Sequence, residues 1–189
     1  MGFLDAFLGK TKLPKSKTKD IFAISTANIT FEANLNLRAL DRAGICFKPQ
    51  ASSHFTQARV EVEELLNYSC KDTSTSYQIT KDSYGYTWIV LEDPDFEDLV
   101  SNIYLVSEGL IERDFGEQLL CALFTFKEEG GANVYWVYNF KHGNFYPFAP
   151  KANKERNSAF EFRLRSVMEK ELPIEKDIER WYPLWDVPV

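Results

Sequence analysis

The chain has 189 residues and a mass of 21.9 kDa, enough for one domain with a proper hydrophobic core. Apolar residues make up 44% and charged residues 26% of the chain, which excludes a disordered polyelectrolyte and a membrane-embedded protein. The net charge of −6 argues against nucleic-acid binding, because contact with phosphates requires a clustered basic surface.

The charge is distributed unevenly along the chain. Residues 1–20 hold five lysines against two aspartates, a local charge of +3, so the remaining 169 residues carry −6 minus 3, or −9. The five are Lys10, Lys12, Lys15, Lys17 and Lys19. We therefore divide the chain into a basic amphipathic arm and linker over residues 1–19 and a single α+β domain over residues 20–189.

The arm begins with an apolar patch on one face of a helical turn or two, followed by lysines. Such a segment is too short to span a bilayer, but it suits an anionic membrane surface or an acidic partner. The alternative is a terminus folded against the domain. Residue 6 is alanine, which does not fit the N-myristoylation motif. The candidate residues for partner or membrane contact are Phe3, Leu4, Phe7, Leu8, Lys10 and Lys12.

The cysteines and the apolar runs indicate the cellular location of the protein. Cys46, Cys70 and Cys121 are odd in number and far apart, which favours a reducing compartment. No run approaches the roughly 20 apolar residues of a membrane span, and the first lysines follow the apolar patch instead of preceding it as in a secretory signal. We expect a cytoplasmic protein, with peripheral contact at the inner face of the membrane through the arm.

The first predicted elements of the domain form a hairpin and a helix. Residues 29–38 alternate apolar and polar side chains, the pattern of a half-buried strand. A polar turn over residues 41–44 leads to a second strand over residues 45–47, which ends before Pro49. The helical spacing of apolar residues over 56–68 then predicts an amphipathic helix.

A second hairpin and the longest helix follow. Residues 77–81 and 86–91 are expected to pair across a turn that contains Gly85. Asp93 and Pro94 match the residue preferences of a helix N-cap and first helical position, and the helix is predicted to run to about Arg113.

The last predicted elements are a meander and a helix. Residues 119–127, 134–140 and 145–148 predict three strands joined by glycine-containing turns. Ser158 and Glu161 have the spacing of a capping box, which predicts a helix that Pro173 ends. The order of elements predicts the α+β class, with a twisted antiparallel sheet backed by helices.

No motif for bond chemistry stands out from this pattern. Glycine-rich phosphate loops are absent, and His54 and His142 lack the spacing of a zinc site. Cys121 lies in an apolar run, where a thiol usually packs in the core instead of acting as a nucleophile. The acidic residues between 92 and 98 fit helix capping better than a calcium loop. We expect no catalytic residue, no metal and no cofactor, and therefore no enzyme.

The aromatic residues leave one alternative open. The predicted strand over residues 134–140 is aromatic on both faces, so it either packs under two layers or leaves one face for a partner. The alternative is an enzyme or small-ligand protein with an aromatic pocket near Tyr135, Trp136, His142 and Tyr146.

Six segments together resemble the PspAB, or phage-shock-protein-A-associated, family of bacteria and archaea. They are residues 1–10 (MGFLDAFLGK), 44–49 (GICFKP), 82–88 (DSYGYTW), 115–121 (FGEQLLC), 145–150 (FYPFAP) and 180–185 (RWYPLW). The resemblance implies a non-enzymatic accessory of envelope-stress systems, whose partner is a PspA-like protein or an HtpX-type membrane protease. It implies no catalytic residues.

The element order from residue 75 onward is also similar to the type III secretion chaperone and YbjN-like fold. That similarity implies protein binding through a sheet or helix face, and often a homodimer, with function decided by the surface. Together, the two resemblances and the arm predict a cytoplasmic, chaperone-like adaptor that binds a protein partner in a membrane-stress response.

Overall fold

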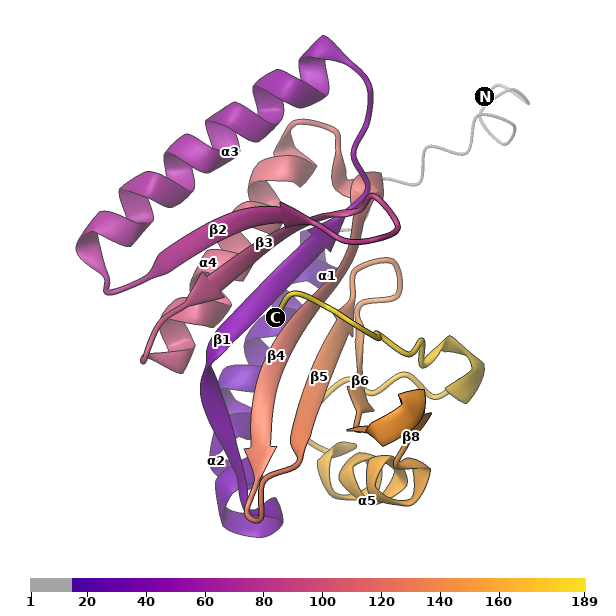
Figure 1. Ribbon diagram of the computed structural model, residues 1–189. Coiled ribbons are helices and arrows are strands. Elements are labelled where there is room, and N and C mark those ends of the chain that lie inside the picture. The colour runs from indigo at the N-terminus through magenta and orange to yellow at the C-terminus, as the bar shows by residue number, and fades with distance from the viewer. Residues whose placement is uncertain (1–14) are drawn as a thin grey trace, which may run out of the picture.

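A six-stranded antiparallel sheet forms the centre of the computed structural model, which describes residues 15–189 (Figure 1). Its strand order is β2-β3-β1-β4-β5-β6. In chain order the strands are β1 Leu37–Phe47, β2 Ser76–Lys81, β3 Thr87–Glu92, β4 Leu119–Glu128, β5 Asn133–Asn139 and β6 Asn144–Phe148, followed by the short separate pair β7 Pro150–Lys151 and β8 Glu155–Arg156.

Helical segments alternate with these strands. They are α1 Lys15–Thr18, η1 Lys19–Phe22, α2 Ala23–Leu35, α3 Ser53–Asp72, α4 Phe96–Glu112, η2 Gly116–Gln118, η3 Ala152–Lys154, α5 Ser158–Met168 and η4 Ile178–Arg180. The α+β class predicted from the sequence is therefore confirmed. The hairpin over residues 77–91 is β2 and β3, and the meander is β4, β5 and β6.

The predicted strand over residues 29–38 is wrong. Residues up to Leu35 belong to helix α2, because the buried positions Ile24, Ala27, Phe31 and Leu35 recur at helical spacing. Ile29, which the alternation placed on the buried face, is 73% exposed. Asn36 then adopts a left-handed conformation with φ 52°, which ends the helix as asparagine can do there.

The predicted turn over residues 41–44 is also wrong. Strand β1 runs through it without a break from Leu37 to Phe47. The polar residues instead coincide with a register shift between Ala39 and Ala43 in the pairing of β1 with β4. A β-bulge accommodates such a shift while the strand continues, so polar residues and a glycine in a strand need not reverse the chain.

Two predicted helix starts are displaced, although both helices exist. Helix α4 is capped by Asp95, whose side chain accepts a hydrogen bond from the Glu97 N–H, so Pro94 precedes the helix. Asp93 is buried and accepts hydrogen bonds from Thr75 and the Asp95 N–H. Helix α5 begins after Asn157, with no side-chain cap, and ends at Met168. The helix predicted over residues 56–68 is α3, which extends further at both ends.

One face of the sheet, which we call the helix face, packs against helices α2, α3 and α4. Aromatic rings join the two layers: the Phe31 ring lies 4.8 Å from that of Phe126 and 5.2 Å from that of Trp136, between centroids. Phe96 of α4 contacts Phe124 and Phe126 in the same way. Rings in these stacked and edge-on arrangements bury large apolar areas, so this layer forms the main core.

The opposite face carries a second apolar cluster, and we call it the C-terminal face. Its buried residues are Cys46, Trp88, Val90, Cys121, Leu123, Val137, Tyr146, Phe148 and Trp181. Residues from the chain's end, including Leu184, Trp185 and Val189, pack against this cluster. In Figure 1 this yellow segment crosses the sheet from the β6 side and ends over its middle strands. Both faces of the aromatic strand β5 are thus covered within the chain.

Candidate functional site

The C-terminal face has a row of side chains from neighbouring strands. Cys46 of β1 pairs in register with Trp88 of β3 on one side and with Cys121 of β4 on the other. Side chains of directly paired residues in an antiparallel sheet point to the same face. Tyr146 of β6 joins this cluster, and all four residues are buried.

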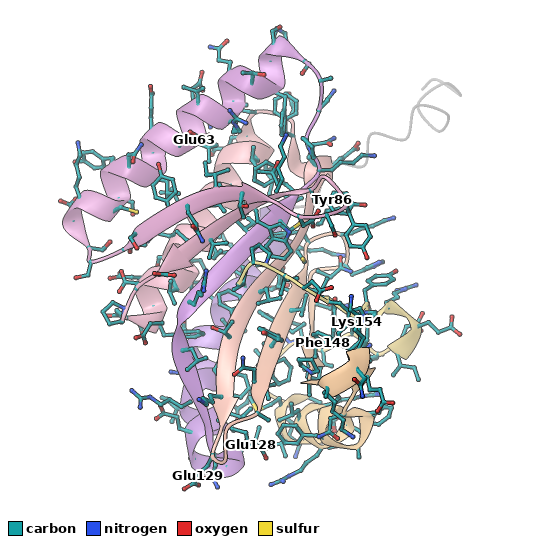
Figure 2. The ribbon with its side chains drawn as sticks, in the orientation of Figure 1. Glu63, Tyr86, Glu128, Glu129, Phe148 and Lys154 are labelled. Atoms are coloured by element: carbon teal, nitrogen blue, oxygen red, sulfur yellow. The ribbon has the colours of Figure 1, made fainter. Side chains whose placement is uncertain are left out.

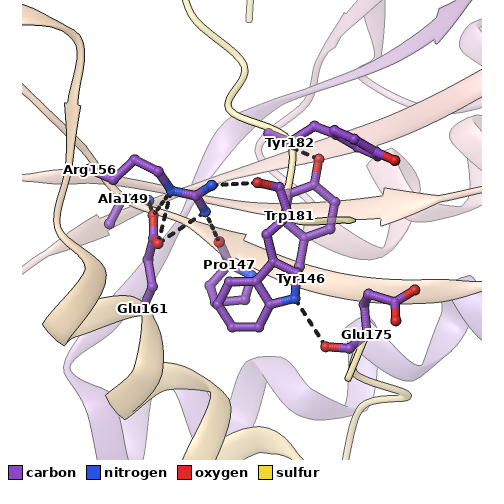
Figure 3. Close-up of polar contacts among 8 residues, drawn as sticks. All are labelled: Tyr146, Pro147, Ala149, Arg156, Glu161, Glu175, Trp181 and Tyr182. Atoms are coloured by element: carbon purple, nitrogen blue, oxygen red, sulfur yellow. Dashed lines mark hydrogen bonds and ion pairs between the residues drawn. The ribbon is translucent and has the colours of Figure 1, made fainter. Parts of the chain in front are cut away.

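Residues 181–189, the C-terminal segment, are held on this face by hydrogen bonds to their backbone carbonyls and from the Trp181 side chain. The Tyr146 hydroxyl donates to the Tyr182 carbonyl at 3.1 Å, and the Trp181 ring N–H donates to the Glu175 carbonyl at 3.0 Å (Figure 3). Arg42 of β1 donates to the Pro188 carbonyl at 3.1 Å. The segment is therefore fixed at its start and near its end.

A buried ion pair supports the start of this segment. Arg156 and Glu161 lie 3.0 Å apart, and the Glu161 side chain also accepts the Ala149 N–H at 2.8 Å (Figure 3). Arg156 donates in addition to the Trp181 carbonyl, and its guanidinium lies over the Phe148 ring. Glu161, which the sequence assigned to a capping box, thus connects α5 to β6 and the C-terminal segment.

A cleft of about 1090 Å³ opens beside the C-terminal segment. Its walls come from the β2–β3 turn, the start of β4, the β5–β6 turn and residues 182–187. The lining side chains that matter below are Lys17, Cys46, Asp82, Tyr84, Tyr86, Trp88, Glu117, Leu120, Cys121, Lys141, His142, Tyr146, Leu184, Trp185 and Asp186. Figure 2 labels Tyr86 at this turn, and Phe148 and Lys154 on the β6–β8 side of the same face.

Asp82 organises the turn that forms one wall of the cleft. Its carboxylate accepts the Trp88 ring N–H at 3.0 Å and the backbone N–H groups of Tyr84 and Tyr86 at 2.9 and 3.0 Å. Gly85 has φ 83°, a conformation that glycine adopts without strain. The turn therefore presents two tyrosines at the mouth of the cleft while Trp88 stays buried at its base.

Cys46 and Cys121 lie at the base of the cleft, and the surroundings of Cys46 keep its thiol protonated. A hydrogen bond with Cys121, and then burial, raise the pKa of Cys46 far above its ordinary value of 9.0. Burial likewise raises the pKa of Tyr146 well above 10.0. Since the thiolate is the nucleophile, this arrangement favours apolar contact with a bound group over covalent chemistry. Within residues 15–189, no group of three or more His, Cys, Asp or Glu side chains is placed to hold a metal ion.

The structure brings together only part of the aromatic pocket proposed from the sequence. His142 and Tyr146 both line the cleft. Trp136 is buried on the helix face, and Tyr135 packs against Phe148, so neither lines the cleft. The missed residues, such as Asp82 and Trp88, reach the site through pairing between distant strands, and only the motif DSYGYTW hinted at them.

The six candidate contact residues in the arm, from Phe3 to Lys12, lie outside the described residues. The arm's described end is part of the domain. Thr18 is buried and donates to Glu108, and the Tyr138 hydroxyl donates to the Lys17 carbonyl. Across the described residues, no helix is both long enough and apolar enough to cross a membrane.

Comparison with known proteins gives one match. Neither the curated proteins nor the solved structures contain a significant match, so the similarity to the type III secretion chaperone and YbjN-like fold stays a prediction. A family model described as PspA associated protein B matches residues 1–189. This match confirms the resemblance that the six sequence segments carried, and it links the protein to PspA systems. The chain belongs to the PspAB family.

Proposed function

We propose that this protein is a non-enzymatic adaptor of a PspA-type envelope-stress response, which binds a PspA-like protein through its amino-terminal arm. The single observation that carries the proposal is the family match over residues 1–189, since the family is described by its association with PspA. The raised pKa of Cys46 supports a binding role, because a protonated thiol is a poor nucleophile.

The arm is the proposed contact segment because of its chemistry and its attachment. Phe3, Leu4, Phe7 and Leu8 offer apolar side chains, and Lys10 and Lys12 offer positive charge for an acidic partner or anionic lipid. Lys17 and Thr18 are hydrogen-bonded to the domain directly after it. A partner that binds the arm is therefore tethered directly to the folded domain. The proposed location is the cytoplasm, with peripheral contact at the membrane.

The test uses purified full-length protein and an arm variant, in which Phe3, Leu4, Phe7 and Leu8 are all replaced by serine. Each is titrated with the PspA-like protein of the same source, and each is floated with vesicles of anionic lipid. We expect the arm variant to bind the PspA-like protein at least about tenfold more weakly, because clustered apolar side chains usually dominate such contacts. Leu65→Ser, at a 43% exposed position on α3, makes the same chemical change outside the arm and should bind normally.

Equal binding by wild type and arm variant would remove the arm from the mechanism, and no binding by either would remove the PspA-like protein as a direct partner. Flotation with the vesicles tests membrane contact separately. An HtpX-type membrane protease, titrated in the same way, tests the second partner that the family resemblance implies. Sedimentation of the protein alone tests the predicted homodimer.

A further inference from the structure

The cleft on the C-terminal face exposes aromatic side chains at its mouth. Tyr84 is 78% exposed and Tyr86 is 36% exposed, while Leu120, Leu184 and Trp185 remain partly exposed inside. Apolar side chains gathered around a hollow of this volume are typical of a contact site. Strand residues such as Cys46, Trp88 and Cys121 form its base, and the turns at one end of the sheet and the C-terminal segment form its walls.

The arm joins the domain at the rim of this cleft. Lys17 lines the cleft, its Nζ donates to the His142 carbonyl at 3.2 Å, and its side chain lies 3.0 Å from where a Cβ on Gly143 would be. The Tyr138 hydroxyl holds its backbone. Leu8 is seven residues before Lys15, where helix α1 begins, and seven residues of extended chain span up to about 25 Å. The linker is therefore long enough to bring the apolar patch of the arm from the rim at Lys17 into the cleft.

The charges of the cleft and the arm are complementary. Among the lining side chains, Asp82, Glu117 and Asp186 outnumber Lys17 and Lys141 by one negative charge, and Lys154, which is not part of the lining, pairs with Asp186. Residues 1–14 carry two lysines against one aspartate, a charge of +1, and the domain beyond residue 20 carries −9. The negative charge of the domain favours a basic apolar segment over an anionic lipid as the occupant of the cleft.

We propose that the cleft binds the amino-terminal segment of its own molecule, with Phe3, Leu4, Phe7 and Leu8 against its aromatic walls. This inference rests on the proposed function, because the same four side chains would contact the PspA-like partner. Docking in the cleft withholds them from partner and membrane, and binding of a partner must release them. The cleft thus sets the availability of the arm.

The experiment titrates a synthetic peptide of residues 1–14 into the full-length arm variant and follows tryptophan fluorescence. The peptide contains no tryptophan, whereas Trp88 and Trp185 line the cleft, so the signal reports on the cleft. We expect saturable binding to the arm variant and none to the wild type, whose own arm occupies the site. Tyr84→Ala introduced into the arm variant should lower its affinity for the peptide at least about fivefold.

The control is Tyr68→Ala, which removes a similarly exposed tyrosine from α3 outside the cleft and should leave peptide affinity unchanged. Absence of peptide binding to the arm variant would overturn the inference, and so would equal binding to the wild type. Vesicle binding through the cleft without peptide binding, or a wild-type dimer that the arm variant cannot form, would instead identify lipid or a second copy as the occupant. None of these outcomes affects the titration with the PspA-like protein, so the proposed function is tested separately.

Discussion

At the scale of single residues, a buried and an exposed ion pair near the C-terminal segment differ in what they contribute to stability. The Glu161 side chain is 3% exposed and bonds both Arg156 and the Ala149 N–H, whereas Lys154 and Asp186 pair in solvent. A buried charge that loses its partner cannot recover its hydration, so the first pair matters to stability and the second does not.

Glu161→Ala should therefore lower the free energy of unfolding by about 3 kcal/mol in a urea titration, because it leaves the Arg156 charge without its counter-ion and the Ala149 N–H without its acceptor. The matched variant Asp186→Asn breaks the exposed pair with Lys154 and should leave the urea midpoint nearly unchanged. Equal losses in both variants would contradict the assignment of the two pairs.

The buried hydroxyl of Tyr146 predicts a dependence of stability on alkaline pH. Burial, and next to it the charge of Cys121, raise the pKa of Tyr146 well above 10.0. Above about pH 10 the unfolded chain therefore releases a proton that the folded chain keeps, and stability falls as pH rises. Tyr146→Phe should reduce this slope by about 1.4 kcal/mol per pH unit, whatever its effect at neutral pH.

The measurement is urea unfolding between about pH 10 and pH 12, with Tyr68→Phe as the control for loss of an exposed hydroxyl. A slope that Tyr146→Phe leaves unchanged would show that this hydroxyl ionises in the folded protein.

At the scale of elements, the sequence predicted what local patterns determine and missed what long-range packing determines. The β2–β3 hairpin and the β4–β6 meander follow from alternation and turn glycines, so they were predictable. Residues 29–35 alternate as well, but burial of Phe31 and Leu35 against the sheet selects the helix. The cleft could not be predicted, because Asp82, Cys121 and Trp185 meet only after the strands have paired and the chain end has crossed them.

The helix over residues 23–35 can be tested by two substitutions two positions apart. In a strand Ile29 and Phe31 would share the buried face, whereas in α2 only Phe31 is buried. Phe31→Ala should cost about 3–5 kcal/mol of unfolding free energy, and Ile29→Ala less than about 0.5 kcal/mol. Similarly large losses of unfolding free energy at both positions would contradict the helix and support a strand over these residues.

The C-terminal segment is expected to contribute to the stability of the domain. Trp181 is buried, stacks on Tyr146 and donates to the Glu175 carbonyl, so Trp181→Ala should cost about 3 kcal/mol. Its neighbour Tyr182 bonds through its carbonyl only and is half exposed, so Tyr182→Ala should change stability by under about 0.5 kcal/mol. Calorimetry of both variants makes the comparison.

At the scale of the whole molecule, Lys17 and the C-terminal segment line the same cleft. Helices cover one face of the sheet and the C-terminal segment covers much of the other. The cleft beside this segment lies where residue 17 joins the domain. The arm, the proposed partner-binding segment, therefore joins the domain beside an apolar hollow that we propose can hold it. A PspA-like protein and the cleft would then compete for the same four side chains.

The central claim is that the arm brings this protein to a PspA-like partner in the cell. Its most direct test is affinity purification of the tagged protein from gently solubilised cells of its own source, alongside the arm variant and Leu65→Ser. We predict that a PspA-like protein is recovered with wild type and Leu65→Ser and is strongly reduced with the arm variant. Recovery of no PspA-like protein, or equal recovery with all three proteins, would contradict the claim.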